Sequence, residues 1–317
     1  MVPEGKKLRV LFVSSGRMGD VGYVVRNQGE SLVRHGIDVD YLTISPGLIG
    51  YIRAVRLIRH KVHAGGYDLI HAHYSLSAFA ASLAGRFPMV VSLMGSDAWQ
   101  GPFLRMVIRF LAAVRWSAVI VKTREMKRKL KLDKALIIPN GVDTDRFKTG
   151  DSDQARQRLG LSLTRKVIVF IAGINRPEKN LPLAREVMEK LNDDSVDLHH
   201  VYGIENSMVP VYLNAADLLL LTSDREGGVN VIKEAMACNC PFVATDVGDI
   251  REIAGETEGC YITGHSGSEI AGVVRQVMKT GARSNGRKRI FELGLDSESV
   301  ALRISELYRS ICEDTRR

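Results

Sequence analysis

Residues 222–249 read TSDREGGVNVIKEAMACNCPFVATDVGD, and this stretch decides the fold. A glycine pair, Gly227 and Gly228, precedes a helix-like run, which a β-branched run follows. Because glycine has no Cβ, the pair lets the backbone turn tightly and come close to a ligand. The helix that starts near Val229 would point free N–H groups and its positive dipole end back toward Glu226. The stretch therefore predicts part of an α/β domain whose turn can receive phosphate or hydroxyl groups.

Two glutamates stand on either side of this turn. Glu234 lies about six residues into the expected helix, roughly 9 Å along it at 1.5 Å per residue. Two carboxylates so separated suit the two ends of an elongated ligand rich in hydroxyl groups, such as a nucleoside diphosphate sugar. The alternative is structural: Glu226 caps the helix and Glu234 lies on its surface.

The remainder of the chain alternates short β-rich runs with longer amphipathic runs, which is typical of parallel sheets covered by helices. We expect an α/β protein with two doubly wound, Rossmann-like domains, residues 1–142 and 143–299, each binding ligands at the carboxyl ends of its strands. Residues 300–317 are expected to form a helix that packs back on the first domain. Strands are expected at Leu8–Ser15, 38–44, 67–73, 88–95, 117–123, 135–141, Lys166–Gly173, 197–203, 217–223, 240–246 and 259–263, and a helix at Leu181–Leu191.

The composition is that of an ordinary soluble globular protein, with 317 residues, 45% hydrophobic and 25% charged. No apolar run approaches the ~20 residues that a membrane span needs. The first residues, MVPEGKKLRVLFVSSG, do not have the pattern of a signal peptide. The four cysteines lack the spacing of a zinc site or a disulfide framework. We therefore expect a reduced, cytoplasmic protein.

Charge is distributed unevenly along the chain. Residues 1–150 hold 23 Lys and Arg against 11 Asp and Glu, a net of +12, and the remainder holds 21 against 25, a net of −4. The basic half indicates an anionic partner, unless its charges only keep it soluble. No motif or aromatic interleaving supports nucleic acid, so we expect no nucleic-acid partner. Peripheral attachment to an anionic membrane and an ordinary solvated surface are both open. The basic residues gather in Leu48–Val62, where Ile52, Val55 and Val62 are expected to share an apolar helix face, at Arg105 and Arg109, and in Lys122–Lys134.

Three motifs in order resemble the family-four retaining glycosyltransferases of the GT-B fold. They are PNGVDTDRF (Pro139–Phe147), PEKN (Pro177–Asn180) and the pair Glu226 and Glu234 with seven residues between them. The resemblance covers nearly the whole chain, and its strongest part is EGGVNVIKEAMACNCPFVATDVGD. It implies two Rossmann-like domains and a nucleotide-sugar donor bound by the second of them.

The resemblance also implies roles for matching positions. Glu234 would bind the ribose hydroxyls and Glu226 the donor sugar. Lys179 would neutralise the diphosphate, on which negative charge grows as the sugar leaves, and Arg176 would add a second positive charge. The other residues implied at the donor are Gly19, Gly22, Gly173, Gly203, Gly227, Gly228, Val229 and Asn230.

The sequence departs from the family pattern at three places. Ile174 stands where the family usually has arginine after the glycine of the IAG strand. Met94 stands where the family often has a histidine before the glycine of the GSD segment. The stretch between Gly203 and the next helix lacks an extra strand and loop that help to hold the base in longer members, so the identity of the base stays open.

Three residues of the first domain are candidates on the acceptor side. His71 and His73 close the expected strand YDLIHAH, and their spacing of two places them on the same face of that strand. A metal pair would have this spacing, but no third ligand is evident. Contact with an acceptor hydroxyl and packing at the strand end are both open. Asp97, in GSDAW, is a candidate for acceptor contact or for a helix N-cap.

The function expected from the resemblance is transfer of a sugar from a nucleotide sugar, with retention, to a glycan or lipid-linked acceptor in cell-surface polysaccharide biosynthesis. The family mechanism is front-face attack, in which the departing phosphate takes the acceptor proton, and no metal or other cofactor is expected. The alternatives are an inactive nucleotide-sugar-binding protein, which Ile174 and Met94 favour, and a GT-B epimerase or phosphorylase.

Overall fold

The chain divides into two compact units. The structure is a computed structural model that describes residues 7–16 and 20–316. Unit 1 comprises Met1–Gly141 and Ser297–Arg317, and unit 2 comprises Val142–Asp296. The boundary lies one residue before the expected one at residue 142. The segment that returns to unit 1 begins at Ser297, three residues before the expected position.

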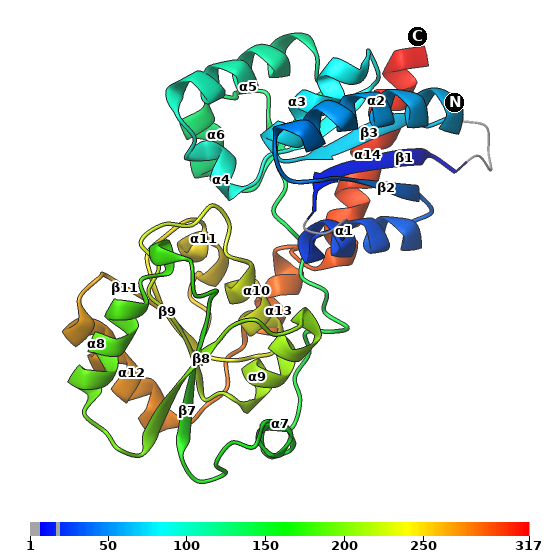
Figure 1. Ribbon diagram of the computed structural model, residues 1–317. Helices are drawn as coiled ribbons and strands as arrows, with labels where there is room; N and C mark the ends of the chain where they lie inside the picture. Colours follow the sequence, from blue (N-terminus) through cyan, green and yellow to red (C-terminus); the bar gives the residue numbers. More distant parts are fainter. Residues whose placement is uncertain (1–6, 17–19, 317) are drawn as a thin grey trace. The chain divides into compact units, whose positions relative to one another are not determined.

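Unit 1 is built on a six-stranded sheet in which every paired strand is parallel, in the order β2-β1-β3-β4-β5-β6. Parallel neighbours need crossover connections, and helices supply them. The strands are β1 (Arg9–Ser15), β2 (Asp38–Ile44), β3 (Leu69–His73), β4 (Met89–Ser92), β5 (Ala118–Val121) and β6 (Leu136–Ile137). The helices, labelled in Figure 1, are α1 (Tyr23–Arg34), α2 (Leu48–Gly65), α3 (Ser75–Ala84), α4 (Gly95–Ala98), α5 (Pro102–Val114), α6 (Arg124–Leu130) and α14 (Ser297–Arg316).

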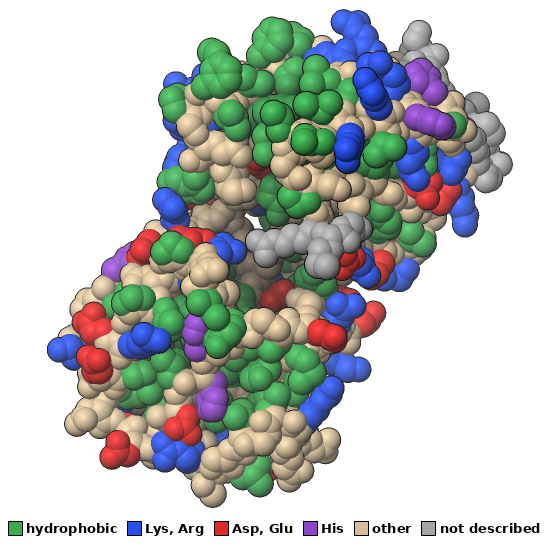
Figure 2. Space-filling model, in the orientation of Figure 1, with side chains coloured by type: hydrophobic (Ala, Val, Ile, Leu, Met, Phe, Trp, Pro, Cys, Tyr) green, Lys and Arg blue, Asp and Glu red, His purple; other side chains and the backbone are tan. Residues whose placement is uncertain are grey.

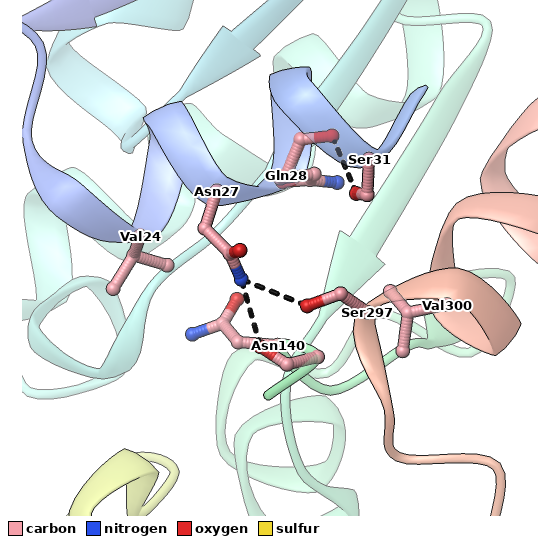
Figure 3. A pocket seen from close by; sticks show the side chains of 8 residues that line it. Val24, Asn27, Gln28, Ser31, Asn140, Ser297 and Val300 are labelled. Carbon is pink, nitrogen blue, oxygen red and sulfur yellow. Dashed lines mark hydrogen bonds between the residues drawn. The ribbon is translucent and has the colours of Figure 1, made fainter. Parts of the chain in front are cut away.

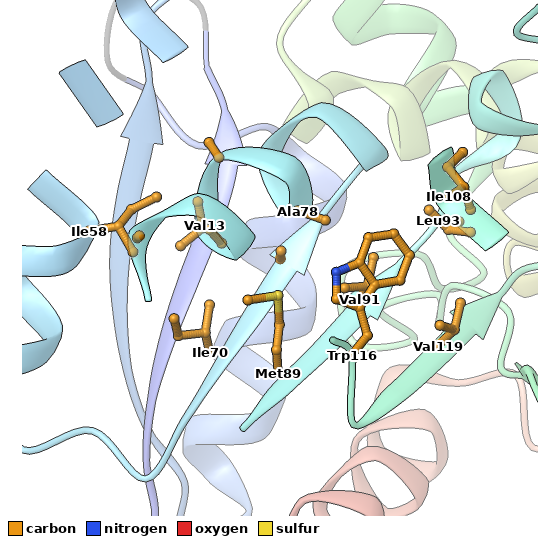
Figure 4. Close-up of a cluster of buried hydrophobic side chains, with 14 of the residues drawn as sticks. Val13, Ile58, Ile70, Ala78, Met89, Val91, Leu93, Ile108, Trp116 and Val119 are labelled. Atoms are coloured by element: carbon orange, nitrogen blue, oxygen red, sulfur yellow. The ribbon is translucent and has the colours of Figure 1, made fainter. Parts of the chain in front are cut away.

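The two faces of this sheet bury different helices. On one face α2, α3, α5 and α6 cover a core in which small alanines of α3 let that helix lie close to the strands. Figure 4 labels some of the buried side chains of this layer, among them Val13, Ile58, Ile70, Ala78, Val91 and Ile108. On the other face α1 and α14 pack on the sheet through a second core that includes Phe12, Leu32, Val300, Ile304 and Tyr308. The last helix therefore belongs to unit 1.

Helix α2 buries only part of the apolar face expected from the sequence. Its buried residues are Ala54, Ile58 and Val62, which are four apart and so lie one above another. Val55 packs at the edge of this face, but Ile52 is 57% exposed. Of the three residues expected to share an apolar face, Val55 and Val62 thus contact the core and Ile52 faces outward.

Unit 2 repeats the architecture with a five-stranded parallel sheet, in the order β11-β10-β9-β7-β8. The strands are β7 (Lys166–Ile171), β8 (Val196–Val201), β9 (Leu218–Leu221), β10 (Phe242–Thr245) and β11 (Cys260–Thr263). The helices are α7 (Ser152–Leu159), α8 (Leu181–Leu191), α9 (Val209–Ala215), α10 (Asn230–Ala237), α11 (Ile250–Ala254), α12 (Gly267–Thr280) and α13 (Gly286–Glu292). The predicted fold class, two doubly wound parallel sheets, is confirmed. Among the described helices, none combines the length and hydropathy that crossing a bilayer requires.

A small pocket in unit 1 lies where the chain leaves this unit and returns to it (Figure 3). The side-chain amide of Asn27 on α1 donates to the Gly141 carbonyl at 3.2 Å and to Ser297 Oγ at 2.9 Å. One buried side chain thus fastens both crossing segments to α1. The pocket is lined by Val24, Asn27, Gln28, Ser31, Asn140, Gly141, Ser297 and Val300.

Candidate functional site

The strand order of unit 2 marks one place for a ligand. The chain passes from β7 to β8 on one side and then to β9 on the other side of β7. In open α/β sheets, ligands bind outside the carboxyl ends of the strands at such a switch point. The loop after β7 carries Lys179, and the loop after β9 carries Glu226. Two of the expected site residues therefore come from the two strands that flank the switch point.

The structure brings Lys179 and Glu226 into direct contact. Lys179 Nζ and Glu226 Oε1 form an ion pair, with the two side chains only 15% and 10% exposed. The hydroxyl of Ser223 also donates to Glu226 Oε1, at 2.8 Å. A charged pair this far removed from water, in a loop rather than in a core, is a feature that ligand sites share.

Hydrogen bonds fix the two loops against each other. The backbone N–H of Asp224 donates to the Glu178 carbonyl at 2.9 Å, and the Asn180 side chain donates to Asp224 Oδ1 at 2.8 Å. The hydroxyl of Thr222 donates to the Asn180 carbonyl at 2.9 Å. The position of the Lys179 side chain relative to Glu226 is thus set by backbone and side-chain bonds on both loops.

Glu234 lies on α10 and is buried, which excludes the interpretation that it lies on the helix surface. Burial raises the pKa of Glu234 to about 7, although Lys233 and Lys179 oppose the shift. Lys233 is buried beside it, and burial lowers the pKa of this lysine despite the attraction of Asp249 and Glu234. Asp249, also buried, accepts from the Val229 N–H at 3.3 Å, and burial raises its pKa.

Sequence reasoning missed Lys233 and Asp249. Their signal was present, since VIKEAMA places two charged residues in succession inside an apolar run and VGD ends the decisive stretch. Helix α10 is buried on nearly every side from Ile232 to Ala237, so both members of the charged pair lie inside. Buried charges need partners, and Lys233 beside Glu234 and Asp249 supplies opposite charge.

The other expected donor residues fall on loops of both units. In unit 2, Gly227 and Gly228 lie where the chain bends before α10, Val229 caps that helix and Asn230 begins it. Gly173 follows β7, and Gly203, with φ +65°, follows β8. In unit 1, Gly22 precedes α1 and has a negative φ of −58°, while Gly19 lies outside the described residues. A Cβ added at Gly22 would meet nothing within 4 Å, so packing within the protein does not require glycine there.

Arg176 is not part of the Lys179–Glu226 contact. Its side chain is 54% exposed and forms an ion pair with Glu178, on the short 3₁₀ turn Pro177–Lys179. Ile174, which stands where the family usually has arginine, is also exposed. The structure thus places one cation, Lys179, against the glutamate and leaves the second on the outside of the same loop.

His71 and His73 have no exposed surface, because β3 lies in the middle of the sheet and is buried on both faces. His71 is hydrogen-bonded through Nδ1 to the Tyr308 hydroxyl and through Nε2 to Ser92 Oγ, at 2.8 Å for the latter. His73 stacks on His71 with 4.3 Å between ring centroids, and neither of its nitrogens has a partner among the described residues. Of the two alternatives, packing at the strand end agrees with this burial, and contact of His71 and His73 with an acceptor hydroxyl does not.

Burial lowers the pKa of both His71 and His73, to about 3 for His73. Within residues 7–16 and 20–316, no group of three or more His, Cys, Asp or Glu could hold a metal ion.

Asp97 has a structural role in unit 1. It is buried at the start of α4, where it accepts from the Met94 N–H at 2.6 Å. It also accepts from the backbone N–H of Ser75 at 3.0 Å and from its hydroxyl at 2.6 Å. Burial raises the pKa of Asp97, and these hydrogen bonds oppose the shift. The capping alternative agrees with this geometry, with the difference that Met94 is the N-cap and Asp97 binds its N–H.

Tyr74 is a residue that sequence reasoning missed. It directly follows β3 at the switch point of unit 1, where β1 lies between β2 and β3. Its φ is +69° and its ψ is 151°, a conformation that is nearly restricted to glycine. Strain of this kind gathers at functional sites, but no sequence pattern reports it because tyrosine rarely adopts such angles.

Two family models match the chain, Glycosyltransferase Family 4 over residues 10–146 and Glycosyl transferases group 1 over residues 161–280. A protein of Bacillus subtilis, named as the teichuronic acid biosynthesis glycosyltransferase TuaC, is 30% identical over 232 residues, 64% of this chain and 59% of that protein. The D-inositol 3-phosphate glycosyltransferase of Mycobacterium leprae is 28% identical over 271 residues, 70% of this chain and 63% of that protein. The chain thus spans about three fifths of the length of these relatives.

Solved structures share the fold at low sequence identity. Sucrose-phosphate synthase from Thermosynechococcus elongatus superposes with a TM-score of 0.81 and 19% identity, covering 96% of this chain and 99% of that chain. HepE of Anabaena, in complex with UDP and glucose, gives a TM-score of 0.77 and 20% identity, covering 96% and 100%. One glycosyltransferase family model matches each half of the chain, and the solved structures share the fold of the whole chain. The chain belongs to the family-4-type glycosyltransferases of the GT-B fold.

Proposed function

We propose that this chain is a retaining glycosyltransferase that moves a sugar from a nucleotide-sugar donor to a glycan or lipid-linked acceptor. The observation that carries the proposal is the Lys179–Glu226 pair at the switch point between β7 and β9, with Glu234 buried on the helix that follows. Carboxylates accept hydrogen bonds from hydroxyl groups, and a lysine can form a charged hydrogen bond to a diphosphate. The three side chains together match the parts of a nucleotide sugar.

Donor binding would replace the contact between Lys179 and Glu226 with contacts from each of them to the donor. In the structure, Glu226 and Lys179 neutralise each other. When a donor enters, its diphosphate would take over Lys179, and Glu226 would be released to accept hydrogen bonds from the sugar hydroxyls. Glu234 would accept from the two ribose hydroxyls, and Arg176 would swing from Glu178 to add charge. The backbone at Gly227–Asn230, together with Gly173 and Gly203, would leave room for the donor.

In the proposed reaction, the bond between the anomeric carbon and the phosphate oxygen breaks as the acceptor oxygen attacks from the same face. The departing phosphate takes the acceptor proton, and configuration is retained. Lys179 favours this step because its charge stabilises the negative charge that grows on the leaving phosphate. The proposal needs no side-chain base and no metal ion or other cofactor.

The proposed setting is polysaccharide biosynthesis in the cytoplasm, at the inner face of the membrane. The similarity to TuaC, named for teichuronic acid biosynthesis, supports a glycan acceptor. The similarity to a D-inositol 3-phosphate glycosyltransferase also supports a small-molecule acceptor. We expect no nucleic-acid partner.

A second candidate function is a nucleotide-sugar-binding protein without transfer activity. The exposed Ile174, at the position where the family usually has arginine, favours it. The presence of Glu226, Glu234 and Lys179 at the positions of the family motif opposes it. Transfer itself distinguishes the two.

The test is calorimetric binding of a nucleotide-sugar panel, beginning with UDP-glucose, GDP-mannose and their free nucleotides. Glu234→Ala should weaken binding of the nucleotide and of its sugar conjugate, whereas Glu226→Ala should weaken only the conjugate. Glu256→Ala, an exposed acid of the same unit, is the matched control. Binding that neither variant changes would refute the donor site. Mass spectrometry would detect transfer or hydrolysis of the sugar. Normal donor binding without either product would favour a nucleotide-sugar-binding protein. Turnover without an acceptor, or only with inorganic phosphate, would indicate an epimerase or a phosphorylase.

A further inference from the structure

One layer of unit 1 exposes an unusual amount of apolar surface. Ten of the twenty large hydrophobic side chains that are exposed among the described residues lie on α2, α3 and α5. These helices cover the same face of the sheet, so their outer sides form one surface. Figure 2 shows the hydrophobic side chains gathered over this part of unit 1. The ten are Leu48, Ile49, Ile52, Leu57, Leu76, Leu83, Phe103, Met106, Phe110 and Val114.

Helix α5 is the clearest case. Phe103, Met106, Phe110 and Val114 fall at intervals of three and four, so they form one stripe along the helix. The stripe faces outward: Phe103 is 67% exposed and Phe110 is 63% exposed, whereas Ile108 is fully buried on the inner side. Solvent-facing stripes of soluble helices are normally polar, and contiguous apolar patches mark interaction surfaces.

The same helices carry charge of only one sign. Helices α2, α3 and α5 contain no aspartate or glutamate. From residue 48 to residue 134 the chain holds 15 Lys and Arg against 4 Asp and Glu. On α5, Arg105 and Arg109 lie beside the apolar stripe, and on α2 three arginines follow the apolar first turn. An apolar stripe with basic residues along its border is the pattern of a helix that lies in a membrane interface.

The topology relates this surface to the carboxyl edge of the sheet. Helices α2 and α3 follow the strands β2 and β3, and α5 ends just before β5 begins, so all three start at the edge where open α/β sheets take ligands. The apolar residues of the first turns, Leu48, Ile49, Leu76 and Phe103, therefore lie toward that edge.

We infer that the outer surface of α2, α3 and α5 binds an anionic lipid bilayer, with Phe103 and Phe110 entering the interface and the flanking arginines meeting lipid phosphates. The positive charge of this surface distinguishes between two possible partners, a second copy of this chain and anionic lipid. A second copy of this chain would bring the same positive charge against it, whereas anionic lipid offers both an apolar interior and complementary charge. The surface belongs to unit 1 alone and does not depend on the donor site in unit 2.

The test is flotation of the whole protein with vesicles of phosphatidylcholine alone and of phosphatidylcholine with phosphatidylglycerol. Binding is expected only to the anionic vesicles and should fall as salt is raised. Arg105→Gln and Arg109→Gln should each weaken it about fivefold (~1 kcal/mol). The double variant Phe103→Ser, Phe110→Ser should weaken it at least as much as both arginine changes. Leu163→Ser, another exposed apolar side chain at 49%, and Lys288→Gln are matched controls in unit 2 and should change nothing.

Circular dichroism and UDP-glucose binding should be unchanged in the α5 variants, because the substituted side chains are not buried and belong to unit 1. Failure of the wild-type protein to bind anionic vesicles at low salt would overturn the inference. So would concentration-dependent dimerisation, abolished by the Phe103 and Phe110 changes, without vesicle binding. Neither result would affect the donor site, since that is measured separately by calorimetry.

Discussion

The buried carboxyl of Glu234 predicts that donor binding depends on pH. Burial raises its pKa from 4.5 to about 7, against the opposing charges of Lys233 and Lys179. In the proposed complex, this carboxyl accepts two ribose hydroxyls, which the ionised form does best. With a pKa of about 7, roughly a tenth of the protein holds it ionised at pH 6 and roughly nine tenths at pH 8. We therefore expect UDP-glucose to bind about tenfold more tightly at pH 8 than at pH 6, a difference of ~1.4 kcal/mol.

Calorimetry in buffers of different ionisation enthalpy measures both the affinity and the protons exchanged. Binding near pH 7 should release about half a proton per donor, because the bound state requires the ionised carboxyl. UDP-glucose is the suitable probe, since its diphosphate is esterified at both ends and lacks the terminal group that titrates near pH 6. Glu234→Gln should bind more weakly and lose the pH dependence, while Glu256→Gln should behave as wild type. His265→Asn controls for the imidazole that lies 3.2 Å from the Ser223 carbonyl.

The reasoning fails if wild-type affinity is flat between pH 6 and pH 8 while Glu234→Gln still weakens binding. Glu234 would then bind the donor without changing its protonation. The pH dependence of folding stability has the opposite sign to that of donor affinity. Because the folded-state pKa lies above the unfolded value, the contribution of Glu234 to stability is present below about pH 4.5 and is lost as the pH rises through about 7.

Three further changes test particular contacts. Lys179→Met should lower the rate of transfer by about 10²–10³-fold in steady-state kinetics, since the leaving phosphate loses its fixed cation; an unchanged rate would remove this lysine from the chemistry. Asn27→Ala should lower the free energy of unfolding by about 1–3 kcal/mol in urea titrations, because the half-buried Gly141 carbonyl and the buried Ser297 hydroxyl lose a donor. Tyr74→Gly should be more stable than Tyr74→Ala by about 1 kcal/mol, because only glycine adopts a φ of +69° without strain, and equal melting temperatures would show that the strain is absent.

Acid provides one more test, in the core of unit 1. Burial lowers the pKa of His73 to about 3, so the unfolded chain binds more protons than the folded protein between about pH 6.5 and pH 3. Stability should therefore fall as the pH drops below about 6.5, by up to ~1.4 kcal/mol per pH unit from this residue. In thermal denaturation followed by circular dichroism, His73→Leu should reduce the slope, and an unaltered slope would contradict the assignment.

Much of the fold could be predicted because local signals agreed with the tertiary structure. The strand Asp38–Ile44 and the helix Leu181–Leu191 were predicted with the bounds that the structure shows. The helix has a sharp start, since the Asn180 side chain accepts from the Leu183 N–H. Errors arose where packing overrode the pattern. In α2, Ala54 and Ile58 are buried against the core, whereas Ile52 is exposed.

The sequence singled out Lys179 and Glu226 one by one, but it could not predict their contact. Lys179 and Glu226 are 47 positions apart, and only the adjacency of β7 and β9 brings their loops together. The histidines show the converse. Alternation along a strand suggests an outward face for polar residues, but a central parallel strand has both faces covered, so His71 and His73 are buried. Sequence spacing fixes the face of a strand, and the neighbouring layers decide whether that face meets water.

The two sheets have the same strand order at their centres, yet different groups occupy their switch points. In unit 2 the loops after β7 and β9 supply a lysine and a glutamate, which suit a charged ligand with hydroxyl groups. In unit 1, β3 ends in buried histidines and the strained Tyr74, and the turn before α1 ends in Gly22 with open space beside it. Among the residues that the structure describes, this point shapes a space but supplies little charge for binding a ligand. Under our proposal the donor therefore belongs to unit 2, and the charge of unit 1, which lies on its outer helices beside an apolar stripe, serves the surface that meets the acceptor's membrane.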